Sequence, residues 1–189
     1  MSAKLFCLVV ACSWFGGAAL SGDELTIVRE GKSDYVIVLP DKATAVERTA
    51  ARELQQHLAQ VAGCMLPIVS EADSPGDKPR MVVGNSETAR RLLAGMDLNS
   101  LAPDAIVIRT VGRDLVLAGH PRRGSLYAVY TFLEDVVGIR WWTATEVHIP
   151  KRPTLRISPQ DITYRPQVPD RSTRYLELSD GCFTNHSLV

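Results

Sequence analysis

Residues 44–63, TAVERTAARELQQHLAQVAG, decide the fold. Thr44 and Glu47 have the spacing of a capping box, in which a hydroxyl and a carboxylate satisfy free N–H groups at the start of a helix. Apolar residues then recur at steps of three and four, which predicts a helix with one buried face. They are Ala43, Val46, Ala50, Leu54, Leu58 and Val61. Gly63 can close this helix in a left-handed conformation.

Short runs rich in valine and isoleucine lie on both sides of this helix and predict strands. They occupy residues 25–29, 35–39, 66–69, 80–83, 105–109, 115–118, 139–142, 147–150 and 154–157. A polar turn separates the runs at 105–109 and 115–118, which is typical of an antiparallel hairpin. Asn85 or Ser86 can cap a short helix that ends before Gly95.

A second long helix is expected within residues 119–138, GHPRRGSLYAVYTFLEDVVG. Pro121 suits its first position, where the missing N–H would be unpaired in any case, and Gly138 suits its end. Its expected buried stripe is Leu126, Val129, Tyr130, Leu133, Val136 and Val137. Together these elements predict an α/β fold, a two-layer sandwich of a mixed β-sheet with two long helices.

The composition is that of a globular protein. Of the 189 residues, 46% are hydrophobic and 22% are charged, with 21 basic and 21 acidic side chains. The apolar fraction argues against disorder. The neutral balance argues against nucleic acid as a partner, because phosphate-binding domains carry a basic excess.

The first residues predict export. Residues 1–21 combine a positive Lys4, an apolar run over 5–20 and a cleavage site after Ser21, with a site after Ala19 as an alternative. A membrane anchor is the competing interpretation, but a span needs about 20 apolar residues. A lipoprotein signal ending at Cys12 is a further alternative. No later stretch is apolar enough to span a membrane, so we expect a periplasmic or extracellular protein.

The mature chain shows no catalytic pattern. Cys64 and Cys182 can pair after export or remain free thiols. None of the four histidines pairs with another histidine or a cysteine at ligand spacing, and no HExxH, phosphate loop or dinucleotide fingerprint occurs. We expect His57 to face solvent on the first helix. The sequence therefore predicts no metal site, no cofactor and no catalytic residue within this chain.

Two stretches have binding chemistry. The basic loop at 119–124 precedes a helix, and helix N-termini attract anions, but exposed arginines beside a closely packed Gly124 are the simpler interpretation. Trp141 and Trp142 are adjacent in a predicted strand and must point to opposite sides of it. We expect one in the core and the other at an interface. Aromatic faces pack on the apolar faces of pyranose rings, so this pair is a candidate sugar contact.

Several stretches, taken together, resemble a known domain. They are AARELQ at 50–55, VAG at 61–63, LPI at 66–68, VVG at 82–84, the segment 119–134 and GIRW at 138–141. In this order they resemble the N-terminal domain that precedes the catalytic barrel in family 20 β-hexosaminidases and family 67 α-glucuronidases, over about residues 24–160. The likeness is greatest to large secreted bacterial proteins in which this domain precedes an uncharacterised barrel domain.

The resemblance implies a non-catalytic sandwich domain at 22–158, packed on its own (β/α)8 barrel, with a linker and the start of that truncated barrel at 159–189. In family 20 enzymes a Pro-aromatic-x-x-Arg-Gly segment opens the barrel, and its arginine binds two sugar hydroxyls. Arg171 follows Pro166 at the corresponding place, without the aromatic residue and with Ser172 instead of glycine. The resemblance therefore implies that Arg171 binds substrate.

The function expected from the sequence is the non-catalytic N-terminal accessory domain of an exported glycoside hydrolase. Such an enzyme would act in carbohydrate metabolism and bind carbohydrate through its barrel. A stand-alone exported carbohydrate-binding or protein-interaction module is one alternative. A small independent hydrolase is another, which the lack of a recognisable catalytic pattern disfavours.

Overall fold

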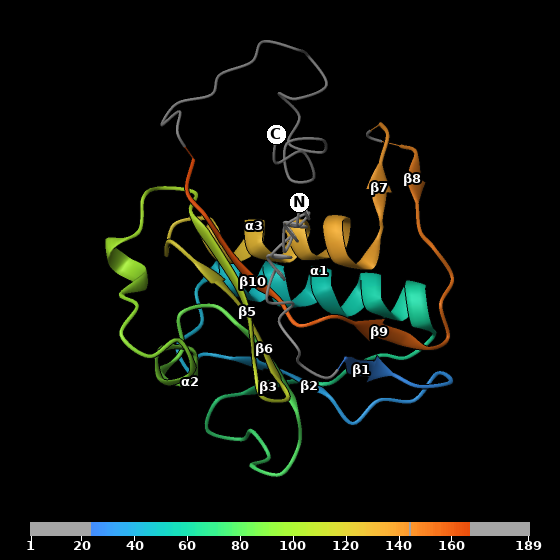
Figure 1. Cartoon of the computed structure of the whole chain (residues 1–189), viewed down its shortest axis with the longest axis horizontal. Helices are drawn as coiled ribbons and strands as arrows, with labels where there is room; N and C mark the ends of the chain where they lie inside the picture. The colour runs from blue at the N-terminus through green and yellow to red at the C-terminus, as the bar shows by residue number, and fades with distance from the viewer. Residues whose placement is uncertain (1–23, 144, 167–189) are drawn as a thin grey trace, which may run out of the picture.

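The computed structural model describes residues 24–143 and 145–166 (Figure 1). Its helices are α1 (Ala45–Ala62), α2 (Glu87–Leu92) and α3 (Gly124–Thr131), with a 3₁₀ turn η1 (Leu98–Ser100) and a π-helical turn η2 (Phe132–Val137). Its strands are β1 (Leu25–Val28), β2 (Val36–Leu39), β3 (Ile68–Ser70), β4 (Arg80–Val83), β5 (Ile106–Val111), β6 (Asp114–Gly119), β7 (Arg140–Trp141), β8 (Val147–His148), β9 (Leu155–Ile157) and β10 (Asp161–Tyr164).

A six-stranded mixed sheet forms the centre, in the order β10-β5-β6-β4-β2-β3. β6, β4, β2 and β3 are parallel, whereas β5 is antiparallel to its neighbours β6 and β10. The predicted hairpin is therefore confirmed. Alternate residues of the central strands enter two separate clusters, with Ile37 and Met81 on one face and Val38 and Val82 on the other. Both faces of the sheet must consequently be covered.

Helix α1 begins at the predicted capping box. The Thr44 N–H donates to Glu47 Oε2 at 2.7 Å, and the Glu47 N–H donates to Thr44 Oγ1 at 3.2 Å. Gly63 ends the helix with φ at 71°. Leu54 and Leu58 are fully buried. The predicted helix face is thus confirmed, and α1 lies beside α3 on one face of the sheet (Figure 1).

The second long helix begins later than the sequence predicts. Pro121 lies in a turn, because the chain must first bring Gly124 directly onto Gly119. A Cβ on Gly124 would lie 2.5 Å from the carbonyl oxygen of Ala105, so only glycine permits this approach. The expectation that Pro121 starts the helix is therefore wrong, while the expected close packing of Gly124 is confirmed.

The second helix also changes its winding. After α3 it continues as the π-helical turn η2 and ends at Gly138 in the left-handed region, as predicted. The wider turn buries Phe132 and Leu133 together. Leu126 and Val136, two residues of the predicted stripe, are only partly buried. A π-helical turn adds a residue to the repeat and so shifts the apolar face.

Shorter elements cover part of the opposite face of the sheet. Ser86 caps α2, because its Oγ accepts the Ala89 N–H at 2.9 Å. Ala89, Leu93 and Leu98 then join Val82 in the smaller core cluster. The main body consists of the sheet and the α1–α3 pair, so the predicted two-layer α/β sandwich is confirmed.

The last described strand lies in the stretch where the resemblance implies a linker. Residues 161–164 form β10, which pairs with β5 at the edge of the central sheet. Ile162 lies opposite Ile108 and packs against the larger core cluster. Residues 161–164 thus belong to the central sheet, because Ile162 has an apolar neighbour on the buried strand β5.

Two further strand pairs stand outside the central sheet. β1 pairs with β9, and β7 pairs with β8, both in antiparallel fashion. The β7–β8 hairpin rises above the right-hand part of the helix layer in this view (Figure 1). These pairs therefore form the periphery of the sandwich.

Substitution of one buried leucine in each of the two long helices tests this core directly. Leu54→Ala and Leu133→Ala each truncate a leucine with no exposed surface. We expect each variant to lower the free energy of unfolding by about 2–5 kcal/mol, through lost burial and a residual cavity. Urea denaturation measures this loss.

Met65→Ala is the matched control, because Met65 is 68% exposed. Its free energy of unfolding should change by less than about 0.5 kcal/mol. Equal losses in the control and in both leucine variants would contradict the assignment of these helix faces.

Candidate functional site

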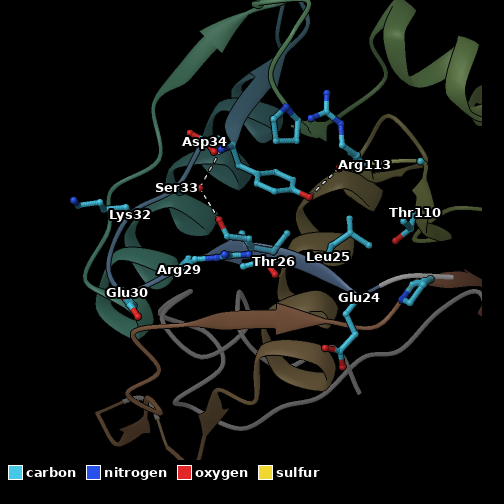
Figure 2. A pocket seen from close by; sticks show the side chains of 15 residues that line it. Glu24, Leu25, Thr26, Arg29, Glu30, Lys32, Ser33, Asp34, Thr110 and Arg113 are labelled. Atoms are coloured by element: carbon cyan, nitrogen blue, oxygen red, sulfur yellow. Dashed lines mark hydrogen bonds between the residues drawn. The ribbon is translucent and has the colours of Figure 1, made fainter.

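A groove of about 1290 Å³ opens along β1 (Figure 2). One wall is β1 and the turn that follows it, and the other is the turn between β5 and β6 together with Pro79. Six charged side chains line it, three acidic and three basic: Glu24, Arg29, Glu30, Lys32, Asp34 and Arg113. All six are exposed. The groove therefore lacks the water-excluded environment in which acid–base catalysis gains most from its electrostatics.

Tyr35 fixes the floor of this groove. Its side chain is 5% exposed, and its hydroxyl donates to the carbonyl oxygen of Arg113 at 2.9 Å (Figure 2). Ser33 donates to the carbonyl oxygen of Ile27 at 2.6 Å and accepts the Tyr35 N–H at 3.1 Å. Burial and the nearby Asp114 raise the pKa of Tyr35 to about 12, against the opposing effect of Arg113. The phenol is thus a neutral structural group.

The carboxyl ends of the parallel strands are the second place where α/β folds bind ligands. Ligands occupy the crevice where successive strands lead to opposite faces of the sheet. Here β2 leads to α1 on one face, and β4 leads to α2 on the other. The structure therefore has the topology of such a crevice between β2 and β4.

Glu47 fills this crevice. Its Oε2 accepts the Thr44 N–H at 2.7 Å and the Thr44 hydroxyl at 2.9 Å, while its Oε1 accepts the Asn85 N–H at 2.9 Å. The residue is only 6% exposed. Gly84 (φ +96°) lies so close that an added Cβ would overlap the Glu47 side chain. The switch point is therefore occupied by the chain itself.

A second carboxylate occupies the N-terminus of α2. Glu71 Oε2 accepts the Glu87 N–H at 3.2 Å, and Glu71 Oε1 accepts the Thr88 N–H. Burial opposes ionisation of Glu71, but the hydrogen bonds from Thr88 and Glu87 outweigh it and lower its pKa. The free N–H groups at the start of α2 thus bind a carboxylate of the same chain.

The described residues hold no cluster of three or more histidine, cysteine or acidic side chains that could bind a metal ion. His57 does not face solvent as expected. Its side chain is 12% exposed, its Nδ1 lies 2.8 Å from the carbonyl oxygen of Glu53, and its ring meets Trp141 edge to face at 5.6 Å. The prediction failed because the strand that carries Trp141 folds over this helix.

The two stretches predicted to have binding chemistry, the basic loop and the tryptophan pair, lie in different surroundings. Arg123 pairs with Asp104 at 2.8 Å and lies 5.5 Å from the ring centre of Tyr127, so its charge is used within the fold. Trp141 packs against the core, whereas Trp142 is 61% exposed. The expectation that one tryptophan packs in the core is therefore confirmed, and the other is exposed; an interface for Trp142 stays a prediction.

Other expectations concern parts of the chain outside the described residues. These are the signal peptide at 1–21, Arg171 and the pairing partner Cys182. Within the described ranges, no helix is both long enough and apolar enough to cross a bilayer.

Neither a family model nor a curated protein matches this sequence. Its fold is similar to that of a solved family GH115 4-O-methyl-α-glucuronidase with specificity for decorated arabinogalactans, with a TM-score of 0.51 and 18% identity over 76% of this chain. The CpGH84D structure gives a TM-score of 0.36 and 15% identity over 58% of this chain. The chain spans 19% and 17% of the length of these two proteins. The likeness to the glucuronidase shows that this chain shares its fold with part of that protein.

The contact between Gly84 and Glu47 can be tested by substitution. Gly84→Ala places a methyl group against the Glu47 side chain and also strains a positive φ. We expect a loss of about 1–2 kcal/mol from the backbone and about 1–3 kcal/mol more from overpacking. Urea denaturation measures the free energy of unfolding.

Gly95→Ala provides the control, because Gly95 has a similar φ of +86° and open space around its Cβ position. It should show only the backbone loss. If the two variants were equally stable, Glu47 would not be packed against Gly84.

Tyr35→Phe tests the floor of the groove. Loss of the hydrogen bond to Arg113 should lower the free energy of unfolding by about 1 kcal/mol at neutral pH. The folded-state pKa lies above the ordinary value of 10.0. The stabilisation by the neutral phenol is therefore complete below that value and is lost as the pH rises toward about 12.

The readout is the difference in unfolding free energy between wild type and Tyr35→Phe across this alkaline range. The wild type should lose its advantage as the pH rises. Other tyrosines are common to both proteins and cancel in the difference. A difference that stays constant with pH would show that Tyr35 ionises normally.

Proposed function

We propose that this chain is the non-catalytic N-terminal accessory domain of an exported glycoside hydrolase and that it packs on a catalytic barrel. The observation that carries the proposal is the fold likeness to the glucuronidase, which covers 76% of this chain but 19% of that one. The shared fold is thus a small part of a much longer glycosidase. That proportion supports an accessory role.

The acidic side chains of the described residues support the same proposal. Glycoside hydrolysis uses a pair of carboxyl groups, one of them an acid with a raised pKa. The buried acids in the described ranges are Glu47 and Asp114. Glu47 is held by Thr44 and Asn85, and Asp114 accepts from the Arg80 side chain at 2.5 Å and from its N–H at 2.9 Å. Both carboxylates therefore have structural roles, and their burial keeps substrate from reaching them.

Export and substrate binding belong to the proposal as well. The signal-like residues 1–21 would direct the protein to the periplasm or the outside of the cell. Arg171 would contribute a planar pair of donors to vicinal sugar hydroxyls once the barrel is in place. Carbohydrate would then bind through that barrel.

The proposal predicts that the full chain hydrolyses no aryl glycoside above background. The assay would use aryl α-glucuronides, aryl N-acetyl-β-hexosaminides and neutral aryl glycosides, beside a known glycosidase as positive control. The physical reason is that the buried acids of the described residues, Glu47 and Asp114, are held within the fold, whereas the acids of the groove along β1 lie in solvent and not in a water-excluded site. Turnover that one substitution within this chain abolishes would overturn the proposal.

Its gene offers an independent check. We expect the reading frame to continue past Val189 into a catalytic domain, for which a (β/α)8 barrel needs about 250 residues. A stop codon directly after Val189 in an intact gene would instead favour a stand-alone module.

A further inference from the structure

The β7–β8 hairpin presents an exposed aromatic ring on a fixed support. The Trp142 N–H donates to the carbonyl oxygen of Glu146 at 2.9 Å, which extends the hairpin beyond its two strands. The Thr143 hydroxyl accepts the Thr145 and Glu146 N–H groups at 3.3 and 3.0 Å. The turn is therefore closed by its own hydrogen bonds.

Trp141 anchors the base of the hairpin in the core. Its ring lies 5.6 Å from the rings of both His57 and Tyr130, edge to face in each case. His57 comes from α1 and Tyr130 from α3. One tryptophan thus ties the hairpin to both long helices, and this fixes the direction of its neighbour Trp142.

Trp142 points away from this anchor. Neighbouring residues of a strand face opposite sides, and Trp142 is 61% exposed. The register pairs Trp141 with Val147 and Arg140 with His148. Arg140, Glu146 and His148 therefore lie on the same side of the hairpin as Trp142. Glu146 and His148 are exposed, whereas the half-buried Arg140 side chain donates to the carbonyl oxygens of Glu134 and Ile139. Polar side chains that can form hydrogen bonds thus share this side of the hairpin with the ring.

We propose that Trp142 is the stacking platform of a carbohydrate contact, and that its ligand is a neutral pyranose residue of a polysaccharide. The ring would cover the C–H face of the sugar, while Glu146, His148 and the Thr143 hydroxyl would bind its hydroxyl groups. A uronic acid would place its carboxylate beside the Glu146 carboxylate, so a neutral sugar fits better.

The size of the apolar surface favours a sugar over a protein. A stable protein interface buries about 800 Å² on each partner, whereas one aromatic side chain supplies about 150–250 Å². The other large exposed apolar side chains of the described residues are Met65, Val147 and Tyr164. Val147 is on the opposite side of the hairpin, Met65 lies in the loop between α1 and β3, and Tyr164 is in β10. Of these four side chains, Trp142 is thus the one on its side of the hairpin.

This contact does not depend on the proposed catalytic domain, because all of its residues lie in the described hairpin. The full chain would be run through native gels that contain soluble galactomannan or xyloglucan, with polygalacturonate as the anionic comparison. We expect retardation by a neutral polysaccharide and none by polygalacturonate. Trp142→Ala should weaken this binding by about tenfold or more.

Two variants serve as controls, and thermal melting would confirm that all variants are folded. Val147→Ala alters the other side of the same hairpin, and Met65→Ala removes the most exposed of these side chains. Both should bind like the wild type.

Lack of binding by the wild type, or binding that survives Trp142→Ala, would overturn the proposal. Equal losses in the control variants would indicate non-specific adsorption and overturn it too. Self-association that depends on Trp142, without retardation by any polysaccharide, would assign the ring to a protein contact instead.

Discussion

The Glu47 carboxylate is the contact on which the rest of the structure depends. A buried carboxylate is tolerated only when its oxygens are hydrogen-bonded, and here Thr44 and Asn85 supply the donors. Thr44 starts the helix on one face of the sheet, and Asn85 precedes the helix on the other. One side chain therefore fixes where the chain diverges to both faces. This position of the Glu47 side chain requires glycine at residue 84, because the Cβ of any other residue would overlap it.

This arrangement has a functional consequence. The crevice that α/β folds usually offer to ligands is filled by Glu47, and the groove along β1 is lined by exposed charges of both signs. The distinctive chemistry lies instead at the periphery, on a hairpin held by Trp141 and tipped by Trp142. A domain with a closed interior and a projecting sugar contact leaves catalysis to another domain, in keeping with the proposed accessory role.

Errors in the sequence analysis arose where a residue's surroundings come from distant parts of the chain. His57 has polar neighbours in sequence, but Trp141 covers it in the fold. Pro121 has the right chemistry for a helix start, but the approach of Gly124 to Gly119 requires a turn there. Residues 161–164 lie in the stretch where the resemblance implies a linker, yet Ile162 pairs with the buried Ile108 of β5. Each outcome depended on a contact that no local pattern contains.

The sequence by itself determined the capping box at Thr44 and Glu47, the helix end at Gly63, the hairpin at 105–118 and the amphipathic face of α1. These features depend on backbone groups and side chains within a few residues, so their signals are local. Only the tertiary structure decided that Glu47 also binds Asn85 and that Trp142 is the exposed tryptophan. Both follow from how the helices and strands pack, because burial is a property of the assembled layers.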